Sequence, residues 1–153
     1  MGILKICFAA SSGGHYEQLM MLKPLMDKYE CFVLTEKTDY AVNNEGKVYY
    51  FPQTNRRELA CIPKLVWIIL KSFFIFLKER PDAIICTGVL SMIPMCLIGK
   101  LFRRSLIYIE SFAKVTSPTI SGKLLYKFAD QFYVQWESMK EVYPKAIYLG
   151  GIY

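Results

Sequence analysis

The sequence predicts an α/β fold, a Rossmann-like parallel sheet with helices on both of its faces. Short apolar runs alternate with segments in which apolar residues recur at helical spacing, and this alternation is typical of a mostly parallel sheet. Two adjacent glycines follow the first apolar run, where such a fold turns sharply from strand to helix. The 153 residues, 54% hydrophobic and 21% charged, fit one packed domain over 1–153 and argue against a disordered chain.

The expected elements follow the chain in order. The first strand covers 3–9 and the first helix 16–26, where Leu19, Leu22 and Met26 recur at helical spacing. Later strands are expected at 31–35, 47–51, 83–87, 106–110, 131–135 and 146–149. The other expected helices cover 62–78, 91–102 and 122–129. Ligands of such sheets bind beyond the carboxyl ends of the strands, so candidate site residues are sought there.

Charge and cysteine content limit the partners. A net charge of +6 in an apolar, aromatic-rich chain favours an anionic partner such as a membrane surface or a phosphorylated ligand. Nucleic acid is not expected, because no recognition motif accompanies the basic residues. The five cysteines lack CxxC spacing and lie mostly in apolar runs, so we interpret them as reduced core residues. With a single histidine besides, we expect no metal site and no bound cofactor.

A glycine turn after the first strand is the first candidate site. Ser11, Ser12, Gly13 and Gly14 precede His15, the only histidine of the chain. Glycines let a ligand approach the backbone, and the helix that follows offers N–H groups to a phosphate. A tight turn without a ligand is the alternative. His15 is a candidate acid–base or binding residue, or else a structural hydrogen-bond partner.

The turn matches neither of the common phosphate-binding motifs. No Gly-Lys-Ser/Thr follows it, so it is not a Walker A loop, and the GxGxxG pattern is incomplete. Glu36 stands about where the ribose-binding acid of a dinucleotide fold is found. A stand-alone nucleotide-binding enzyme therefore remains an alternative.

The segment 62–78 is the most unusual of the chain. Three lysines recur at every seventh position and share one stripe of the expected helix, while most other positions are aliphatic or aromatic. The apolar runs are shorter than the roughly 20 residues of a spanning helix. We expect a helix lying in the plane of an anionic membrane, with Arg56 and Arg57 nearby; burial against another element is the alternative. The residues expected at the membrane are Lys64, Trp67, Lys71, Phe74 and Lys78.

Three segments in order resemble a known family. They are 11–15 with Glu17, then 109–111 followed by 121–126, then Asp130 with 132–136. Together they are similar to the membrane-anchoring subunit of the eukaryotic two-component UDP-GlcNAc transferase of dolichol-linked oligosaccharide assembly. They resemble equally its bacterial relatives in capsule and exopolysaccharide clusters and, more distantly, the N-terminal domain of the transferase that makes lipid II.

The resemblance implies the N-terminal, acceptor-side domain of a GT-B glycosyltransferase. Such a chain binds a lipid-linked sugar acceptor at the cytoplasmic face of a membrane, and a separate donor-binding subunit holds most of the UDP-sugar and is needed for activity. His15 and Glu110 are the implied catalytic residues, although Glu110 could instead cap a helix or pair with Lys114 or Lys123. The implied acceptor- or phosphate-binding residues are Ser11, Ser12, Gly13, Gly14, Ser121, Gly122 and Lys123. The residues implied at the partner interface are Tyr148, Gly150, Gly151 and Tyr153.

Two other functions stay open at this point. One is a stand-alone Rossmann-type nucleotide-binding enzyme. The other is a membrane scaffold that tethers a soluble transferase and contributes no catalytic residue.

Overall fold

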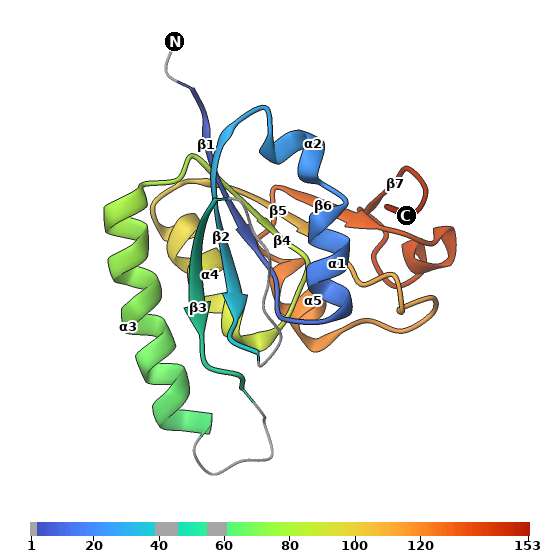
Figure 1. Ribbon diagram of the computed structural model, residues 1–153. Helices are drawn as coiled ribbons and strands as arrows, with labels where there is room; N and C mark the ends of the chain where they lie inside the picture. The colour runs from blue at the N-terminus through green and yellow to red at the C-terminus, as the bar shows by residue number, and fades with distance from the viewer. Residues whose placement is uncertain (1–2, 39–45, 55–60) are drawn as a thin grey trace.

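Seven parallel strands form a single sheet in the order β3-β2-β1-β4-β5-β6-β7 (Figure 1). The structure is a computed structural model that describes residues 3–38, 46–54 and 61–153. The strands are β1 (Lys5–Ala9), β2 (Glu30–Glu36), β3 (Lys47–Phe51), β4 (Ala83–Cys86), β5 (Ser105–Ile109), β6 (Gln131–Val134) and β7 (Ile147–Tyr148). The strand order reverses beside β1, so the carboxyl ends of β1 and β4 flank the position where ligands of doubly wound sheets bind.

Helices cover both faces of the sheet, as the sequence predicts. Figure 1 shows α1 and α2 in front of the sheet, α4 behind it, and α3 running alongside β3. The helices are α1 (Gly14–Met20), α2 (Lys23–Met26), α3 (Cys61–Glu79), α4 (Ile93–Leu101) and α5 (Ile120–Leu125), with 3-10 turns η1 (Leu90–Met92) and η2 (Glu137–Lys140). The α/β fold and its parallel sheet are therefore confirmed.

Side chains that point alternately to the two faces of the sheet form two hydrophobic cores. Phe8 of β1 faces α1 and packs in a cluster with Leu19, whereas its neighbour Cys7 faces the opposite layer with Ile75 and Met95. Successive strand residues point to opposite faces. Strands covered on both faces read as continuous apolar runs, which explains why the sequence revealed them so clearly.

The first predicted helix is wrong in its extent. The segment expected as one helix over 16–26 is divided into α1 and α2, with a turn at Met21 and Leu22. Pro24 lies in the first turn of α2. In one continuous helix its ring would clash with the carbonyl of Met20 and leave that carbonyl without an N–H donor, so the chain turns and starts again.

Two other helices differ from their expected bounds. The segment expected to be helical from 91 begins as the 3-10 turn η1, and α5 begins two residues earlier than expected and ends at Leu125. Thr119 fixes the start of α5, because its hydroxyl accepts a 2.8 Å hydrogen bond from Gly122 N. The remaining boundaries lie within two residues of those expected.

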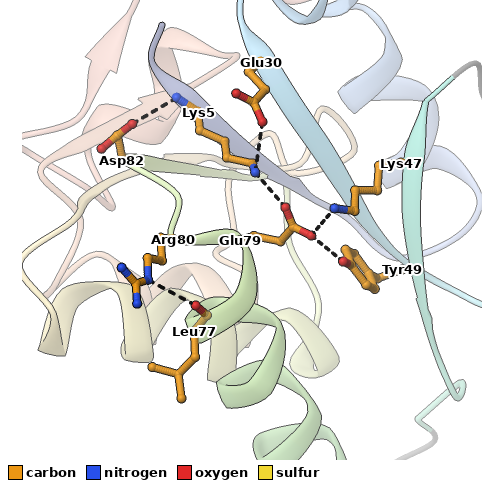
Figure 2. A network of polar contacts seen from close by, with 8 residues as sticks. All are labelled: Lys5, Glu30, Lys47, Tyr49, Leu77, Glu79, Arg80 and Asp82. Atoms are coloured by element: carbon orange, nitrogen blue, oxygen red, sulfur yellow. Dashed lines mark hydrogen bonds and ion pairs between the residues drawn. The ribbon is translucent and has the colours of Figure 1, made fainter. Parts of the chain in front are cut away.

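A buried carboxylate ties α3 to the sheet at the end opposite the carboxyl edge. Glu79 is 3% exposed and forms ion pairs with Lys5 of β1 and Lys47 of β3, together with a hydrogen bond from Tyr49 (Figure 2). Lys5 also pairs with Glu30 at 3.0 Å. Burial alone would raise the pKa of Glu79, but these three donors outweigh it and lower the pKa to about 2.

Candidate functional site

Three elements meet at the carboxyl edge of the sheet around Gly88. His15 lies in the first turn of α1, and its carbonyl oxygen accepts a 2.8 Å hydrogen bond from Thr87 Oγ1, just after β4. A Cβ built on Gly88 would stand 3.2 Å from His15 Nδ1 and 3.4 Å from Tyr108 Oη of β5. The absence of a side chain at Gly88 therefore lets an imidazole and a phenol approach the same point.

The backbone at this point is strained. Gly88 has a φ of 129° and the next residue, Val89, a φ of 90°. A β-branched residue in that region costs on the order of 1–3 kcal/mol, and such strain gathers at binding and catalytic sites. Val89 N is held by a 3.4 Å hydrogen bond to Ser121 Oγ, which links this turn to the start of α5.

Glu110 lies just after β5 and faces the interior. It is 1% exposed, and its carboxylate accepts hydrogen bonds from Ser111 N (2.9 Å), Thr119 N (3.2 Å), Thr119 Oγ1 (2.8 Å) and Tyr143 Oη (2.9 Å). Neither Lys114 nor Lys123 is among these partners. The carboxylate thus binds the residue that caps α5, and both of its oxygens are occupied by protein donors.

Tyr108 lies near both of the residues that the sequence singles out. Tyr108 Oη lies 3.3 Å from Thr119 Oγ1, which itself contacts Glu110. His15 Nδ1 and Tyr108 Oη both lie close to the point that a side chain of Gly88 would occupy. Burial, and next the charge of Glu110, raise the pKa of Tyr108 well above its usual value, so its hydroxyl stays protonated. Tyr108, Thr119 and Glu110 therefore form one group of polar contacts, and His15 lies near it at Gly88.

The glycine turn lies at the same edge and is open. Nothing lies within 4 Å of a Cβ built on Gly13 or Gly14, and Gly13 has a φ of 74°, which favours glycine. Ser11 is buried and Ser12 is half-buried, with a 3.3 Å hydrogen bond from Ser11 Oγ to Ser12 O. The exposed backbone of this turn lies next to His15 in the chain.

The three residues expected at the start of α5 differ in their surroundings. Ser121 and Gly122 are buried and are already engaged, Ser121 by Val89 N and Gly122 by Thr119 Oγ1. Lys123 is exposed. Of this set, Lys123 is the residue whose side chain is available to a phosphate.

Sequence reasoning did not single out Gly88, Tyr108, Thr119 or Tyr143. Gly88 follows an apolar strand, and that position alone is a weak signal. Tyr108 lies inside a predicted strand, and Tyr143 lies 33 residues from its partner Glu110. No local pattern marks either tyrosine.

The outer face of α3 is apolar and exposed. Its inner face buries Ile68, Ser72, Ile75 and Phe76. Within the described ranges, no helix is long and apolar enough to cross a membrane. The exposed apolar side chains of the outer face are Ile62, Val66, Trp67, Ile69, Leu70, Phe73, Phe74 and Leu77.

The lysines of α3 border this face on the side of β3. Lys71 Nζ donates a 2.6 Å hydrogen bond to Tyr50 O and lies 4.6 Å from the centre of the Trp67 ring. Burial lowers the pKa of Lys71. Lys78 Nζ lies 5.8 Å from the ring centre of Tyr49, and Lys64 is half-buried. Lys71 and Lys78 therefore contact β3. Arg56 and Arg57 lie outside the described residues.

The C-terminal tail folds back against the sheet beside an apolar cavity of about 340 Å³. Ile152 N donates a 3.0 Å hydrogen bond to Gln135 Oε1, and the Tyr153 ring packs on Phe112 with centroids 5.1 Å apart. Leu149 is 81% exposed. The cavity is lined by α2, by β4 to β6 and by the tail, including Leu25, Ile107, Tyr133, Leu149, Gly150, Gly151 and Ile152.

Two expectations about small ligands can be compared with this geometry. In the described part of the chain, no group of three or more His, Cys, Asp or Glu side chains is placed to hold a metal ion. Glu36 is buried at the end of β2 and accepts a 2.7 Å hydrogen bond from Ser91 Oγ. That carboxylate oxygen is thus engaged inside the protein.

The comparison with protein families decides which family the chain belongs to. A family described as "Oligosaccharide biosynthesis protein Alg14 like" matches residues 6–152. The chain belongs to the Alg14-like family. This Alg14-like chain is 30% identical over 179 residues to the human UDP-N-acetylglucosamine transferase subunit ALG14, covering 97% of the chain and 83% of the human protein. The Saccharomyces cerevisiae subunit of the same name is 24% identical, with 96% and 76% covered.

Some alignments span less of the relative. This Alg14-like chain matches 56% of the Rattus norvegicus subunit, at 32% identity over 77% of its own length. Among solved structures, the UDP-N-acetylglucosamine 2-epimerase of Rickettsia bellii has a TM-score of 0.74 at 15% identity, covering 99% of this chain and 46% of the epimerase. MurG of Acinetobacter baumannii has a TM-score of 0.69 at 16% identity, covering 88% and 42%. The likeness shows the GT-B-like fold, and the chain spans less than half of each structure.

Proposed function

We propose that this chain is the acceptor-binding, membrane-associated subunit of a two-component, UDP-sugar-dependent glycosyltransferase. Its product is a lipid-linked oligosaccharide, as in capsule or exopolysaccharide biosynthesis, and a separate subunit binds the donor. The observation that carries the proposal is the placement of His15, beside a strained glycine turn at the carboxyl edge, in a chain of the Alg14-like family. Its relatives are named subunits of a UDP-N-acetylglucosamine transferase.

In this proposal His15 is the base that activates the acceptor. The acceptor hydroxyl oxygen attacks the anomeric carbon of the sugar nucleotide, the bond to the UDP oxygen breaks, and His15 takes the hydroxyl proton. The glycine turn and Lys123 contact the phosphates of the lipid acceptor, because both are open to solvent. Glu110, which is buried among four donors, supports the site from within.

The partner docks on the C-terminal tail and the cavity beside it. Tyr148, Leu149 and Tyr153 expose apolar surface at the last strand, and Gly150 and Gly151 line the cavity. Exposed apolar side chains around an apolar hollow are the features of a protein interface. The occupant in this proposal is the donor-binding subunit, of GT-B C-terminal type.

The outer face of α3 rests on the cytoplasmic side of an anionic membrane. A helix with this continuous apolar face and a border of lysines is suited to lie in the headgroup region. The net charge of +6 adds attraction to anionic lipids. In this proposal the acceptor site lies beside the lipid that carries its substrate.

Reconstitution with the donor-binding protein tests the proposal. The chain alone should release no UDP from a UDP-sugar in the presence of a lipid-linked acceptor, and addition of the partner should start transfer. His15→Gln should reduce transfer by about 100-fold or more while the two proteins still co-purify. Transfer by the chain alone, or NAD retained through purification, would favour a stand-alone nucleotide-binding enzyme. Full activity of both His15→Gln and Glu110→Gln in the complex would instead favour a membrane scaffold that contributes no catalytic residue.

A further inference from the structure

We infer that Gln135 is a positioning residue that couples the C-terminal tail, residues 149–153, to the elements that carry His15 and Glu110. The tail is where the proposed partner docks, so this inference rests on the proposed function. Through Gln135, the position that the partner gives to the tail sets the geometry of the acceptor site.

The side chain of Gln135 is buried just beyond the end of β6, and both of its polar atoms have partners. It is 4% exposed. A carboxamide has two N–H groups and one carbonyl oxygen. Nε2 donates to Glu110 O at 2.9 Å and to Gln18 Oε1 at 3.2 Å. Oε1 accepts a hydrogen bond from Ile152 N at 3.0 Å. Both N–H groups of this buried amide are therefore used.

The backbone partners fix the orientation of the amide. The carbonyl oxygen of Glu110 only accepts hydrogen bonds, and the backbone N–H of Ile152 only donates them. A flipped amide would place its oxygen against the carbonyl of Glu110 and its N–H groups against the N–H of Ile152. All three contacts therefore depend on a single orientation of one buried side chain.

The three contacts reach three separate segments of the chain. Gln18 lies in α1, three residues after His15, and is itself 4% exposed. Glu110 follows β5, and its carboxylate accepts from Thr119, the residue that caps α5. Ile152 belongs to the tail. The first helix, the end of β5 and the tail therefore converge on the same amide.

Apolar packing holds the tail in the same position. The ring of Tyr153 packs on Phe112, in the loop after β5, with centroids 5.1 Å apart. A Cβ built on Gly151 would stand 3.2 Å from Phe112 Cε2, so the absence of a side chain lets the tail approach that ring. The side chain of Ile152 packs against the core cluster to which Leu19 of α1 belongs. These contacts support the docked tail that the hydrogen bond to the amide requires.

Release of the tail would change the surroundings of the amide. Without Ile152 N, Oε1 of Gln135 loses its donor, and a buried acceptor without a donor is unfavourable. Water that takes the place of Ile152 N no longer prevents the amide from turning. A turned amide loses its bonds to Glu110 O and Gln18. A docked tail and a released tail therefore favour different arrangements of α1 and of the chain at Glu110.

The partner favours the docked tail. Tyr148, Leu149 and Tyr153 expose apolar surface here, and a partner that covers this surface holds the tail in place. Binding of the partner thereby orders the site that receives the acceptor. By linkage, the acceptor strengthens binding of the partner by the same factor. The partner thus contributes to acceptor binding in addition to the donor site that it supplies.

The single histidine of the chain makes this coupling measurable without the partner. Ile152→Pro removes the N–H that Gln135 accepts, because proline has none. In a chain with 15N-labelled histidine, Ile152→Pro should shift the imidazole signals of His15. In a Gln135→Met background the same substitution should cause no further shift. Unshifted signals in Ile152→Pro, or an equal shift in both backgrounds, would overturn the inference.

Matched variants separate the hydrogen bonds from other effects. Ile152→Val keeps the N–H and should leave the His15 signals unchanged; the shift seen with Ile152→Pro would exclude the hydrogen bond as its cause. Gln131→Met makes the same chemical change at an exposed position of β6 and should preserve the Ile152→Pro shift. Gln18→Met leaves the other bonds of Gln135 in place and should reduce the shift, because the link to α1 is lost.

These spectra need neither partner nor acceptor, so their outcome is independent of the proposed function. In the reconstituted pair, Gln18→Met should raise the KM for the lipid-linked acceptor by about 5-fold or more. Binding of the partner without acceptor should change little, because the tail is intact. An unchanged KM alongside changed spectra would show that Gln135 links the tail to α1 as inferred but that the acceptor does not bind beside His15, which contradicts the proposed function instead.

Discussion

Gly122 lies directly against the carboxylate of Glu110: a Cβ built on Gly122 would stand 2.1 Å from Glu110 Oε2 and 2.7 Å from Tyr143 Oη. Because Gly122 has no side chain, α5 can approach the buried carboxylate. Thr119 therefore caps the helix and binds Glu110 at the same time. The site therefore depends on a residue that carries no functional group.

Gly122→Ala should destabilise the protein by about 2–3 kcal/mol, because the methyl group displaces Glu110 or Tyr143 from their hydrogen bonds. Urea unfolding measures the change. Gly14→Ala is the control, since nothing lies within 4 Å of its Cβ and its φ is not positive; its stability should change little. Equal stabilities of the two variants would show that the contact at Gly122 relaxes without cost.

The Glu79 network predicts a loss of stability in acid. The pKa of Glu79 is lowered from 4.5 to about 2 in the folded protein, so between these values the unfolded chain binds more protons. Stability therefore rises with pH through this window: the contribution is present above about pH 4.5 and disappears as the pH falls toward 2. At neutral pH it amounts to roughly 3 kcal/mol.

Urea unfolding of the wild type and Glu79→Gln at pH 7 and pH 3 tests this linkage. The difference in the free energy of unfolding between the two proteins should shrink at the lower pH. A difference that stays constant from pH 7 to pH 3 would mean that folding does not lower the pKa of Glu79.

The outer face of α3 should bind anionic vesicles. Replacing Leu70 and Phe74 by glutamine should weaken binding by about 10-fold or more, because two exposed apolar side chains no longer enter the bilayer. Vesicle co-sedimentation measures the change. Met21→Gln, at an exposed apolar residue between α1 and α2, should bind as the wild type does. Equal binding by all three proteins would show that the outer face of α3 does not contact the membrane.

Three buried thiols should be inert in the folded protein. Burial raises the pKa of Cys7 well above its usual value, and the hydrogen bond with Cys86, followed by burial, does the same for Cys96. Cys7, Cys86 and Cys96 are all fully buried. At pH 8 a thiol reagent should modify Cys31 and Cys61, which are partly exposed, and should reach the other three only in urea. Rapid modification of all five in the absence of urea would contradict the fold.

The edge of the sheet that holds the site could be predicted from the sequence. Apolar strands buried on both faces are visible without an alignment, and the glycine turn before His15 follows the first of them. Glu110 was predicted as a site residue only from the resemblance to the family. The single helix expected over 16–26 is wrong because the ring of Pro24 excludes a continuous helix, although the apolar residues recur at helical spacing.

The sequence by itself determined the alternation of strands and helices, the glycine turn and the apolar character of α3, because each depends on neighbours within a few positions. Only the tertiary structure decided that Glu110 faces inward, that Lys71 donates to Tyr50 O, and that the side chains of His15 and Tyr108 both lie close to Gly88. These relationships join residues up to 93 positions apart, from His15 to Tyr108. The orientation and burial of side chains that are far apart in the sequence arise from packing across the sheet. Local sequence periodicity therefore cannot predict them.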